Sequence, residues 1–164
     1  MNEPLSFYVH VPYCVKRCGY CDFNTYTPSE LREGSDLKSV SNGYIDLLIK
    51  EIGMARAVAP TNSPIPTIFF GGGTPTLMEP SDLGLVLMEL SNTYGFAEDI
   101  EITIEANPDT VTKEKLSKLR SIGMNRISFG MQSAAPNVLK VLDRTHDPEN
   151  VIKATTWARE VGFD

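Results

Sequence analysis

The sequence predicts an α/β fold in which about four β-α units supply a parallel sheet. Short apolar segments rich in β-branched and aromatic residues alternate with longer segments of helical periodicity along the 164 residues. Each expected strand also alternates apolar and polar side chains, whereas strands covered by helices on both faces are usually apolar throughout. Hydrophobic residues make up 41% of the chain, which is enough for one core in a single domain.

The first unit begins with an expected strand over 5–11, which reads LSFYVHV. A polar stretch follows over 27–43, and it is long for a loop inside a compact domain, so we expect it to be mobile or functional. A helix is then expected over 44–57. Its apolar residues share one face: Ile45, Leu48, Ile49 and Ile52.

Three further units follow the same order of strand and helix. The strands are expected over 65–70, 100–106 and 125–132, and the helices over 80–94, 112–122, 136–142 and 147–161. A glycine-rich loop, GGGTPT, closes the second strand. Thr112 is expected to be the N-terminal cap of the helix over 112–122. Trp157 lies among apolar residues of the last helix and is expected to pack in the core.

Two helix ends resemble each other and suggest how the chain continues. Gly123 and Gly162 both occupy the place where a helix ends in a glycine, and a strand follows Gly123 at once. By the same pattern a fifth strand is expected to begin near Phe163. We therefore expect residues 1–164 to be the front portion of a longer core domain, cut before that strand. The fourth strand would then be an open edge, which predicts marginal stability or self-association.

The alternation along the strands predicts two different faces. Phe7, Val9 and Val11 share one face, and Tyr8 and His10 the other. One explanation is an antiparallel sheet with a solvated face. The β-α order instead favours a curved parallel sheet or partial barrel, in which the polar face lines a lumen where ligands bind.

Composition and targeting signals exclude several classes of function. The net charge is -6 with no basic stripe, so we expect no nucleic-acid partner. The start of the chain lacks the pattern of a signal peptide, and no apolar run approaches the ~20 residues of a membrane span. The three cysteines lie close together rather than spread along the chain, so we expect a reduced, cytoplasmic location.

The cysteines form the pattern C-x3-C-x2-C directly after the first expected strand: Cys14, Cys18 and Cys21. Zinc in a structural site usually takes four protein ligands, and His10 or His146 would have to be the fourth. An iron–sulfur cluster is also held by thiolates, and three ligands on a four-iron cube leave one iron open to bind a ligand. Unrelated free cysteines are a third possibility. We favour the iron–sulfur cluster.

The motifs resemble those of radical S-adenosylmethionine (SAM) enzymes, in particular the oxygen-independent coproporphyrinogen III oxidase group. The resemblance runs through YVHVPYCVKRCGYCDFNTY, GGGTPT, IEANPD, SFGMQS and residues 142–144, and so covers nearly the whole chain. It implies a (β/α)6 partial barrel in which the three cysteines hold a [4Fe-4S] cluster. It also implies that SAM chelates the open iron, and that an electron from the cluster cleaves the sulfonium and releases a 5'-deoxyadenosyl radical.

One departure from the family separates two functions. In the enzymes that decarboxylate coproporphyrinogen a fourth cysteine follows the third by two positions, and here that position is Phe23. Phenylalanine there resembles the HemW-type heme chaperones. The resemblance thus implies an electron donor, SAM, heme or a porphyrin, and an acceptor protein that receives heme. The heme-binding motif of that family lies later than residue 164. The alternatives are oxidative decarboxylation of coproporphyrinogen III to protoporphyrinogen IX, and a zinc-binding module.

The resemblance also implies a set of SAM contacts, and no further catalytic residue. They are Tyr8, Tyr20, Gly72, Gly73, Thr74, Glu105, Gln132 and Arg144. Gly72, Gly73 and Thr74 match the loop at the methionine end of SAM. Without the family, the glycines would be a tight turn, Glu105 an ion-pair partner of Arg126, and Arg144 a solvated surface residue. A further family contact, an aspartate on the fifth strand, falls beyond Asp164.

Overall fold

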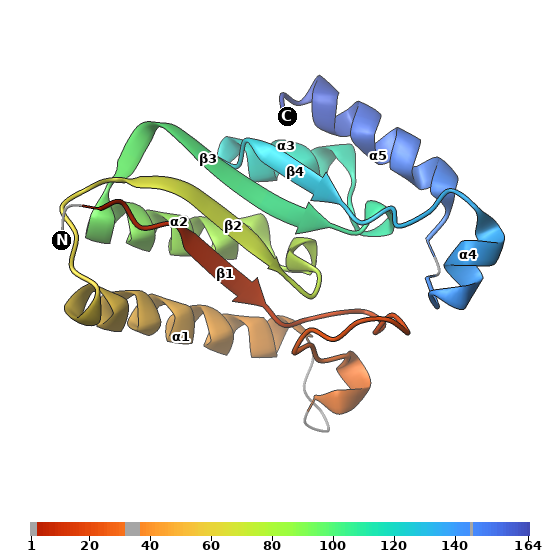
Figure 1. Cartoon of the computed structure of the whole chain (residues 1–164), viewed down its shortest axis with the longest axis horizontal. Coiled ribbons are helices and arrows are strands. Elements are labelled where there is room, and N and C mark those ends of the chain that lie inside the picture. The colour runs from red at the N-terminus through yellow and green to blue at the C-terminus, as the bar shows by residue number, and fades with distance from the viewer. Residues whose placement is uncertain (1–2, 32–36, 145) are drawn as a thin grey trace.

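The computed structural model describes residues 3–31, 37–144 and 146–164. Four parallel strands form one sheet in the order β1-β2-β3-β4 (Figure 1). The strands are β1 (Phe7–Val11), β2 (Ile65–Gly72), β3 (Phe96–Ala106) and β4 (Arg126–Phe129). The helices are α1 (Leu37–Val58), α2 (Pro80–Tyr94), α3 (Lys113–Ser121), α4 (Pro136–Val141) and α5 (Pro148–Glu160). The α/β class and the parallel sheet expected from the sequence are confirmed.

One face of the sheet packs under helices. The register aligns Val9 with Phe70, Phe70 with Ile104 and Ile104 with Ile127, so apolar side chains form a row across all four strands. Buried residues of α1, α2, α3 and α5 belong to the same hydrophobic cluster. Trp157 packs partly buried against it, as expected.

The other face of the sheet is polar and largely open. Tyr8 is exposed on β1, and Arg126 on β4 pairs with Glu101 on β3 at 3.6 Å. Because the strands are parallel, the explanation by an antiparallel sheet with a wet face is wrong. The polar face and the helix-covered face are those of a partial barrel.

The first helix is longer than the sequence predicted. It begins at Leu37, whereas residues up to 43 were expected to be loop. Ser39, Ser41 and Gly43 have low helix propensity, so the sequence pattern did not predict a helix over these first turns. A 3-10 turn, Pro28–Glu30, occupies another part of the expected loop, and 32–36 lie outside the described residues.

Two strand boundaries also differ from the prediction. β3 begins at Phe96, four residues before the expected start at Ile100, because Phe96 pairs with Ile65 across an irregularity in the ladder. β4 ends at Phe129, so Gln132 lies beyond the strand rather than at its end. The backbone at Gln132 is left-handed, with φ of 60°.

The two similar helix ends have the same geometry. Gly123 and Gly162 adopt φ of 106° and 91°. The residue after each glycine closes the helix end: the Met124 amide donates to the Leu119 carbonyl, and the Phe163 amide donates to the Ala158 carbonyl. After the second end, Asp164 pairs with β4: its N–H donates to Asn125 and its carbonyl accepts from Ile127, at 3.0 and 3.1 Å. This is the pairing expected at the start of a fifth parallel strand.

Among the helices that the structure describes, none is both long and apolar enough to cross a membrane.

Candidate metal and cofactor site

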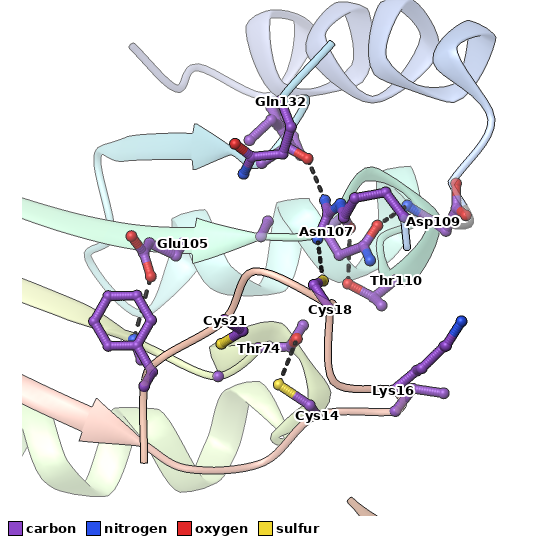
Figure 2. A pocket seen from close by; sticks show the side chains of 18 of the residues that line it. Cys14, Lys16, Cys18, Cys21, Thr74, Glu105, Asn107, Asp109, Thr110 and Gln132 are labelled. Atoms are coloured by element: carbon purple, nitrogen blue, oxygen red, sulfur yellow. Dashed lines mark hydrogen bonds between the residues drawn. The ribbon is translucent and has the colours of Figure 1, made fainter. Parts of the chain in front are cut away.

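A cavity of about 480 Å³ lies where the loop after β1 meets the carboxyl ends of β2, β3 and β4. Figure 2 shows Cys14, Cys18 and Cys21 below it, with Glu105 and Gln132 on other sides. Ten of the eleven site residues predicted from the sequence line this cavity: Cys14, Cys18, Tyr20, Cys21, Gly72, Gly73, Thr74, Glu105, Gln132 and Arg144. Ligands of open parallel sheets bind at this end of the strands.

Backbone hydrogen bonds hold the cysteine loop in place. The N–H of Cys14 donates to the backbone carbonyl of Tyr26 at 3.0 Å, and the N–H of Cys21 donates to the backbone carbonyl of Cys18 at 3.0 Å. Gly19 donates to Leu142 at 3.2 Å, and a Cβ there would lie 3.3 Å from the Cβ of Asp143. The loop therefore packs closely against the segment that follows α4.

The three thiols line the same cavity. Two of them have a donor from elsewhere in the fold. The Thr74 hydroxyl lies 3.8 Å from the Cys14 sulfur, and Arg144 Nη1 lies 3.4 Å from the Cys18 sulfur. Burial raises the pKa of the Cys14 thiol, the charges of Cys21 and Cys18 raise it further, and a bond from Thr74 opposes them. Three thiols whose charges influence one another can serve one centre.

The donor set fits an iron–sulfur cluster better than a zinc ion. Within the described ranges, no three His, Cys, Asp or Glu side chains lie close enough to bind one metal ion together. In a four-iron cluster each thiolate binds a different iron, so the sulfurs need not converge on a point. The expected fourth zinc ligands are also occupied or enclosed: His10 Nε2 bonds the Asn24 carbonyl at 2.8 Å, and His146 is 4% exposed.

The glycines of the β2 loop allow two backbone segments to approach each other. A Cβ at Gly73 would lie 2.5 Å from the carbonyl oxygen of Tyr13, and Gly72 has φ of 107°. The amides of Gly73 and Thr74 donate to Val11 and Tyr13, both at 2.7 Å. The sequence predicted that these glycines would let a ligand approach the backbone closely. In the structure, the amides of Gly73 and Thr74 hold the start of the cysteine loop against the β2 loop.

Glu105 lies on the polar side of β3 and is not paired with Arg126. Its Oε2 accepts from the Gly72 amide at 3.2 Å, while Arg126 pairs with Glu101. Burial raises the pKa of the Glu105 carboxyl, and the bond from Gly72 opposes this. The ion pair considered as an alternative is therefore wrong, and Glu105 presents a carboxylate to the cavity.

Arg144 joins the cysteine loop to the segment after β4. Nη1 donates to Cys18, Nη2 donates to the Gly130 carbonyl, and Nε is buried without a partner. It is therefore not a solvated surface residue. A buried guanidinium N–H without an acceptor is costly, and a carboxylate on a bound ligand would supply the acceptor.

Tyr8 is the predicted site residue that the structure leaves outside the cavity. Its ring stacks on Phe69 at 5.9 Å and 16° on the polar face of the sheet, and 54% of the residue is exposed. Burial and the charge of Glu105 raise the pKa of Tyr8, so the two lie near each other. Tyr8 therefore faces the lumen beside the cavity and does not form part of the cavity wall.

Several cavity residues were missed in the sequence. They include Lys16, Asn107, Asp109, Thr110, Phe129 and Gly130. Asn107, Asp109 and Thr110 follow β3 directly, and the position of a polar turn at a strand's carboxyl end was the signal that could have found them. Asn107 orders this turn by accepting from the Asp109 amide at 3.1 Å.

Comparisons with known proteins show the family to which the chain belongs. The radical SAM superfamily pattern matches residues 8–164. The chain is 40% identical over 162 residues to the heme chaperone HemW of Mycobacterium tuberculosis, covering 99% of this chain and 40% of that protein. It is 36% identical over 160 residues to HemW of Escherichia coli, covering 98% and 40%. The chain thus spans about two fifths of the length of these relatives.

Two solved structures are similar as well. The coproporphyrinogen III oxidase HemN of Escherichia coli, described as a radical SAM enzyme, superposes with a TM-score of 0.83 at 31% identity over 99% of this chain and 36% of that one. The protein anSMEcpe with bound AdoMet and a peptide superposes with a TM-score of 0.63 at 17% identity, over 99% and 42%. The second likeness shows the fold alone.

Proposed function

Since the chain belongs to the radical SAM superfamily, which implies SAM and a [4Fe-4S] cluster, we propose that it is the front portion of the core domain of a HemW-like heme chaperone. The convergence of the cysteine loop with the ends of β2, β3 and β4 on one cavity carries this proposal. Heme is the proposed ligand because these relatives are named heme chaperones. The heme acceptor and the electron donor remain predictions from the family resemblance, and a cytoplasmic location remains a prediction from the close spacing of the cysteines.

In this proposal Cys14, Cys18 and Cys21 hold the cluster. The sulfurs of Cys14 and Cys18 each have a hydrogen-bond donor, Thr74 and Arg144, which would help to orient them toward the cluster. When bound, the cluster would supply one electron at a time to SAM held beside it. The protein's part is to hold the two groups together and to keep water away from them.

The proposed SAM contacts surround the same cavity. Arg144 Nε would donate to the SAM carboxylate, because it is buried and unpartnered. The Glu105 carboxylate would accept from SAM hydroxyl or ammonium groups. Tyr20, Gly72, Gly73, Thr74 and Gln132 complete the wall. Tyr8 is proposed as a contact to whatever enters the lumen next to SAM, since it faces the lumen outside the cavity wall.

Phe23 decides between the chaperone and the related enzyme. It lines the cavity with 59% of its surface exposed, at the position where the decarboxylating enzymes of the family carry a fourth cysteine. A phenyl ring cannot donate a proton, bind iron or form a thiyl group. The similarity to HemN keeps coproporphyrinogen dehydrogenase as the second candidate, and Phe23 predicts that this activity is absent.

The cofactor proposal is tested by anaerobic reconstitution with iron and sulfide, followed by EPR of the reduced protein with and without SAM. We expect a four-iron signal that changes when SAM is added. A four-iron signal indifferent to SAM would contradict the proposed SAM site. Bound zinc without iron or sulfide would instead support the zinc-binding module.

The chaperone proposal is tested on the full-length protein. We expect stoichiometric heme binding, measured by the Soret band, and no protoporphyrinogen IX from coproporphyrinogen III. Formation of that product with SAM and a reductant would overturn the chaperone assignment in favour of the dehydrogenase. A Phe23→Cys variant that gains no turnover would show that other residues also separate the two functions.

A further inference from the structure

The end of α4 has the same geometry as the ends of α3 and α5, but a different residue at its turn. At each end the residue after the C-cap is left-handed, with φ of 106° at Gly123, 91° at Gly162 and 53° at Asp143. The amide after Asp143 donates to the Leu139 carbonyl at 2.9 Å, as the corresponding amides do at the other two ends. Glycine adopts this conformation without steric cost, whereas aspartate is only tolerated in it. The backbone therefore does not explain the aspartate, and its side chain supplies the reason.

That side chain pairs with the cysteine loop. Asp143 Oδ1 lies 2.6 Å from Nζ of Lys16, which stands between Cys14 and Cys18 in the sequence. Both side chains line the cavity and are about half exposed, at 54% and 50%. An ion pair this exposed contributes little to the stability of a whole domain. It is strong enough, however, to favour one position of a loop.

The residues on both sides of Asp143 contact the same loop. The Leu142 carbonyl accepts from the Gly19 amide at 3.2 Å, and Arg144 Nη1 lies 3.4 Å from the Cys18 sulfur. A Cβ at Gly19 would lie 3.3 Å from the Cβ of Asp143, so the two segments are in contact. Successive residues of a helix point about 100° apart, and the turn at the end of α4 brings three of them to one loop. Their contacts fall before, at and after Cys18.

We propose that Asp143 is a positioning residue for the cysteines. Its ion pair with Lys16, here called the latch, ties the cysteine loop to the end of α4 and holds Cys18 at the cavity in the absence of a cofactor. The inference rests on the proposed function, in which Cys18 is a cluster ligand. A loop opens locally with a free energy far below that of global unfolding. Loss of a half-exposed ion pair is enough to raise the open fraction about two- to fivefold.

The test is alkylation of the cluster-free, reduced full-length protein with iodoacetamide, followed by peptide mass spectrometry that gives a rate for each cysteine. The rate reports how often the loop opens, and the measurement needs no iron. Asp143→Asn removes the charge, keeps the size of the side chain and tolerates the left-handed backbone. We expect it to raise the alkylation rate of Cys18 about two- to fivefold. A rate equal to that of wild type would overturn the latch.

The double variant Lys16→Gln/Asp143→Asn separates the latch from a direct effect of charge on the thiol. A nearby positive charge favours the reactive thiolate and a negative charge disfavours it, so the two direct effects oppose each other in the double variant. The loss of the latch remains. We expect Cys18 in the double variant to react about two- to fivefold faster than in wild type. A double variant with the wild-type rate would show that charge alone acts, and would overturn the latch.

Asp143→Gly separates the side chain from the fold. Glycine takes the left-handed turn more easily, so we expect a melting temperature no lower than that of wild type. The carboxylate is gone, so the alkylation rate of Cys18 should rise as it does in Asp143→Asn. An aspartate needed only for the turn would leave that rate unchanged when glycine replaces it, and this result would overturn the positioning role.

The matched control is Glu160→Gln, which breaks an ion pair of similar geometry. Glu160 pairs with Lys113 at 2.7 Å, with side chains 48% and 55% exposed, and neither residue lines the cavity. We expect no change in the alkylation of Cys18. A rise equal to that of Asp143→Asn would show that the loss of any such ion pair loosens the loop, and would overturn the specific role of Asp143.

The cofactor proposal and the latch fail in different ways. A wild-type protein that assembles no cluster on reconstitution would defeat the proposed cofactor, whereas alkylation of the cluster-free protein would still test Asp143. Unchanged alkylation of Cys18 in a protein that does assemble the cluster would defeat the latch alone.

Discussion

At the scale of single residues, Arg144 has the least complete bonding in the cavity. It holds Cys18 and the Gly130 carbonyl, and its Nε has no acceptor. We expect Arg144→Gln to weaken SAM binding by roughly 10- to 100-fold, because a hydrogen bond to a charged group contributes about 1.5–3 kcal/mol. Equilibrium dialysis of the reconstituted protein measures this. Arg126→Gln, which removes an arginine paired with Glu101 outside the cavity wall, should bind SAM as wild type does.

The comparison is valid only if iron content is unchanged, since Arg144 also touches a cysteine. SAM affinity in Arg144→Gln equal to that of Arg126→Gln would mean that Nε finds its partner elsewhere.

His146 is a second residue whose buried atoms lack partners. Both ring nitrogens are buried without a hydrogen bond. Burial lowers the pKa of His146, the charge of Arg144 lowers it further, and Asp109 and Asp147 oppose this. The folded protein therefore binds a proton less readily than the unfolded chain, whose histidine pKa is about 6.5.

The sign of the pH dependence follows from this difference. Above about pH 6.5 neither state is protonated at His146, and as the pH falls through that value the unfolded state gains a proton that the folded state resists. The contribution of neutral His146 to stability is thus present at pH 7.5 and lost on acidification. We expect urea unfolding to show that wild type loses more stability between pH 7.5 and 5.5 than His146→Leu does. Equal losses would show that His146 can be protonated in the folded state.

At the scale of elements, the β2 loop and the cysteine loop act as one clamped unit. A Cβ at Gly73 would meet the Tyr13 carbonyl at 2.5 Å and the Val11 carbonyl at 2.9 Å, both of them backbone atoms that cannot turn aside. We expect Gly73→Ala to destabilise the chain by about 1–3 kcal/mol and to reduce its iron content, because the cysteine loop must move.

Gly53→Ala is the matched control on α1, where a Cβ would have nothing within 4 Å. It should raise stability by about 1 kcal/mol, as alanine does in a helix interior. Thermal unfolding and iron analysis of both variants test the contrast. A Gly73→Ala protein with unchanged melting temperature and iron would show that the clamp is not required.

The sequence predicted the elements better than their limits. Periodicity located the strands and helices of the described chain, because one face of each is apolar. Val9 and Val11 are buried on β1, and Leu83, Val86, Leu87 and Leu90 are buried on α2. Periodicity could not locate the start of α1, whose first turns have low helix propensity, or of β3, where Phe96 is held by its pairing with Ile65. The cysteines and Arg144 were found through the family motif. The positions of Tyr8 and of Gln132 depend on lumen geometry and a left-handed backbone, which no local pattern reports.

At the scale of the whole molecule, the sheet has an open end at β4. In the described part of the chain only Asp164 pairs along its outer side, through Asn125 and Ile127. A parallel edge with unpaired N–H and C=O groups is a template for another strand. If residues 1–164 are the front of a longer domain, as proposed, they would expose this edge when studied by themselves.

We expect residues 1–164 to self-associate through that edge, with an average mass in static light scattering that rises with protein concentration. Ser128 is exposed on β4, on the side that lines the cavity, and it gives a way to test the route, since a lysine on an edge strand opposes strand addition. Ser128→Lys should lower the mass at a given concentration, whereas Ser91→Lys, on α2 away from the edge, should leave it unchanged. A monodisperse monomer at all concentrations would mean that the pairing of Asp164 with β4 is enough to prevent association through this edge. Equal effects of the two lysines would mean that association runs through net charge or another surface, and not through β4.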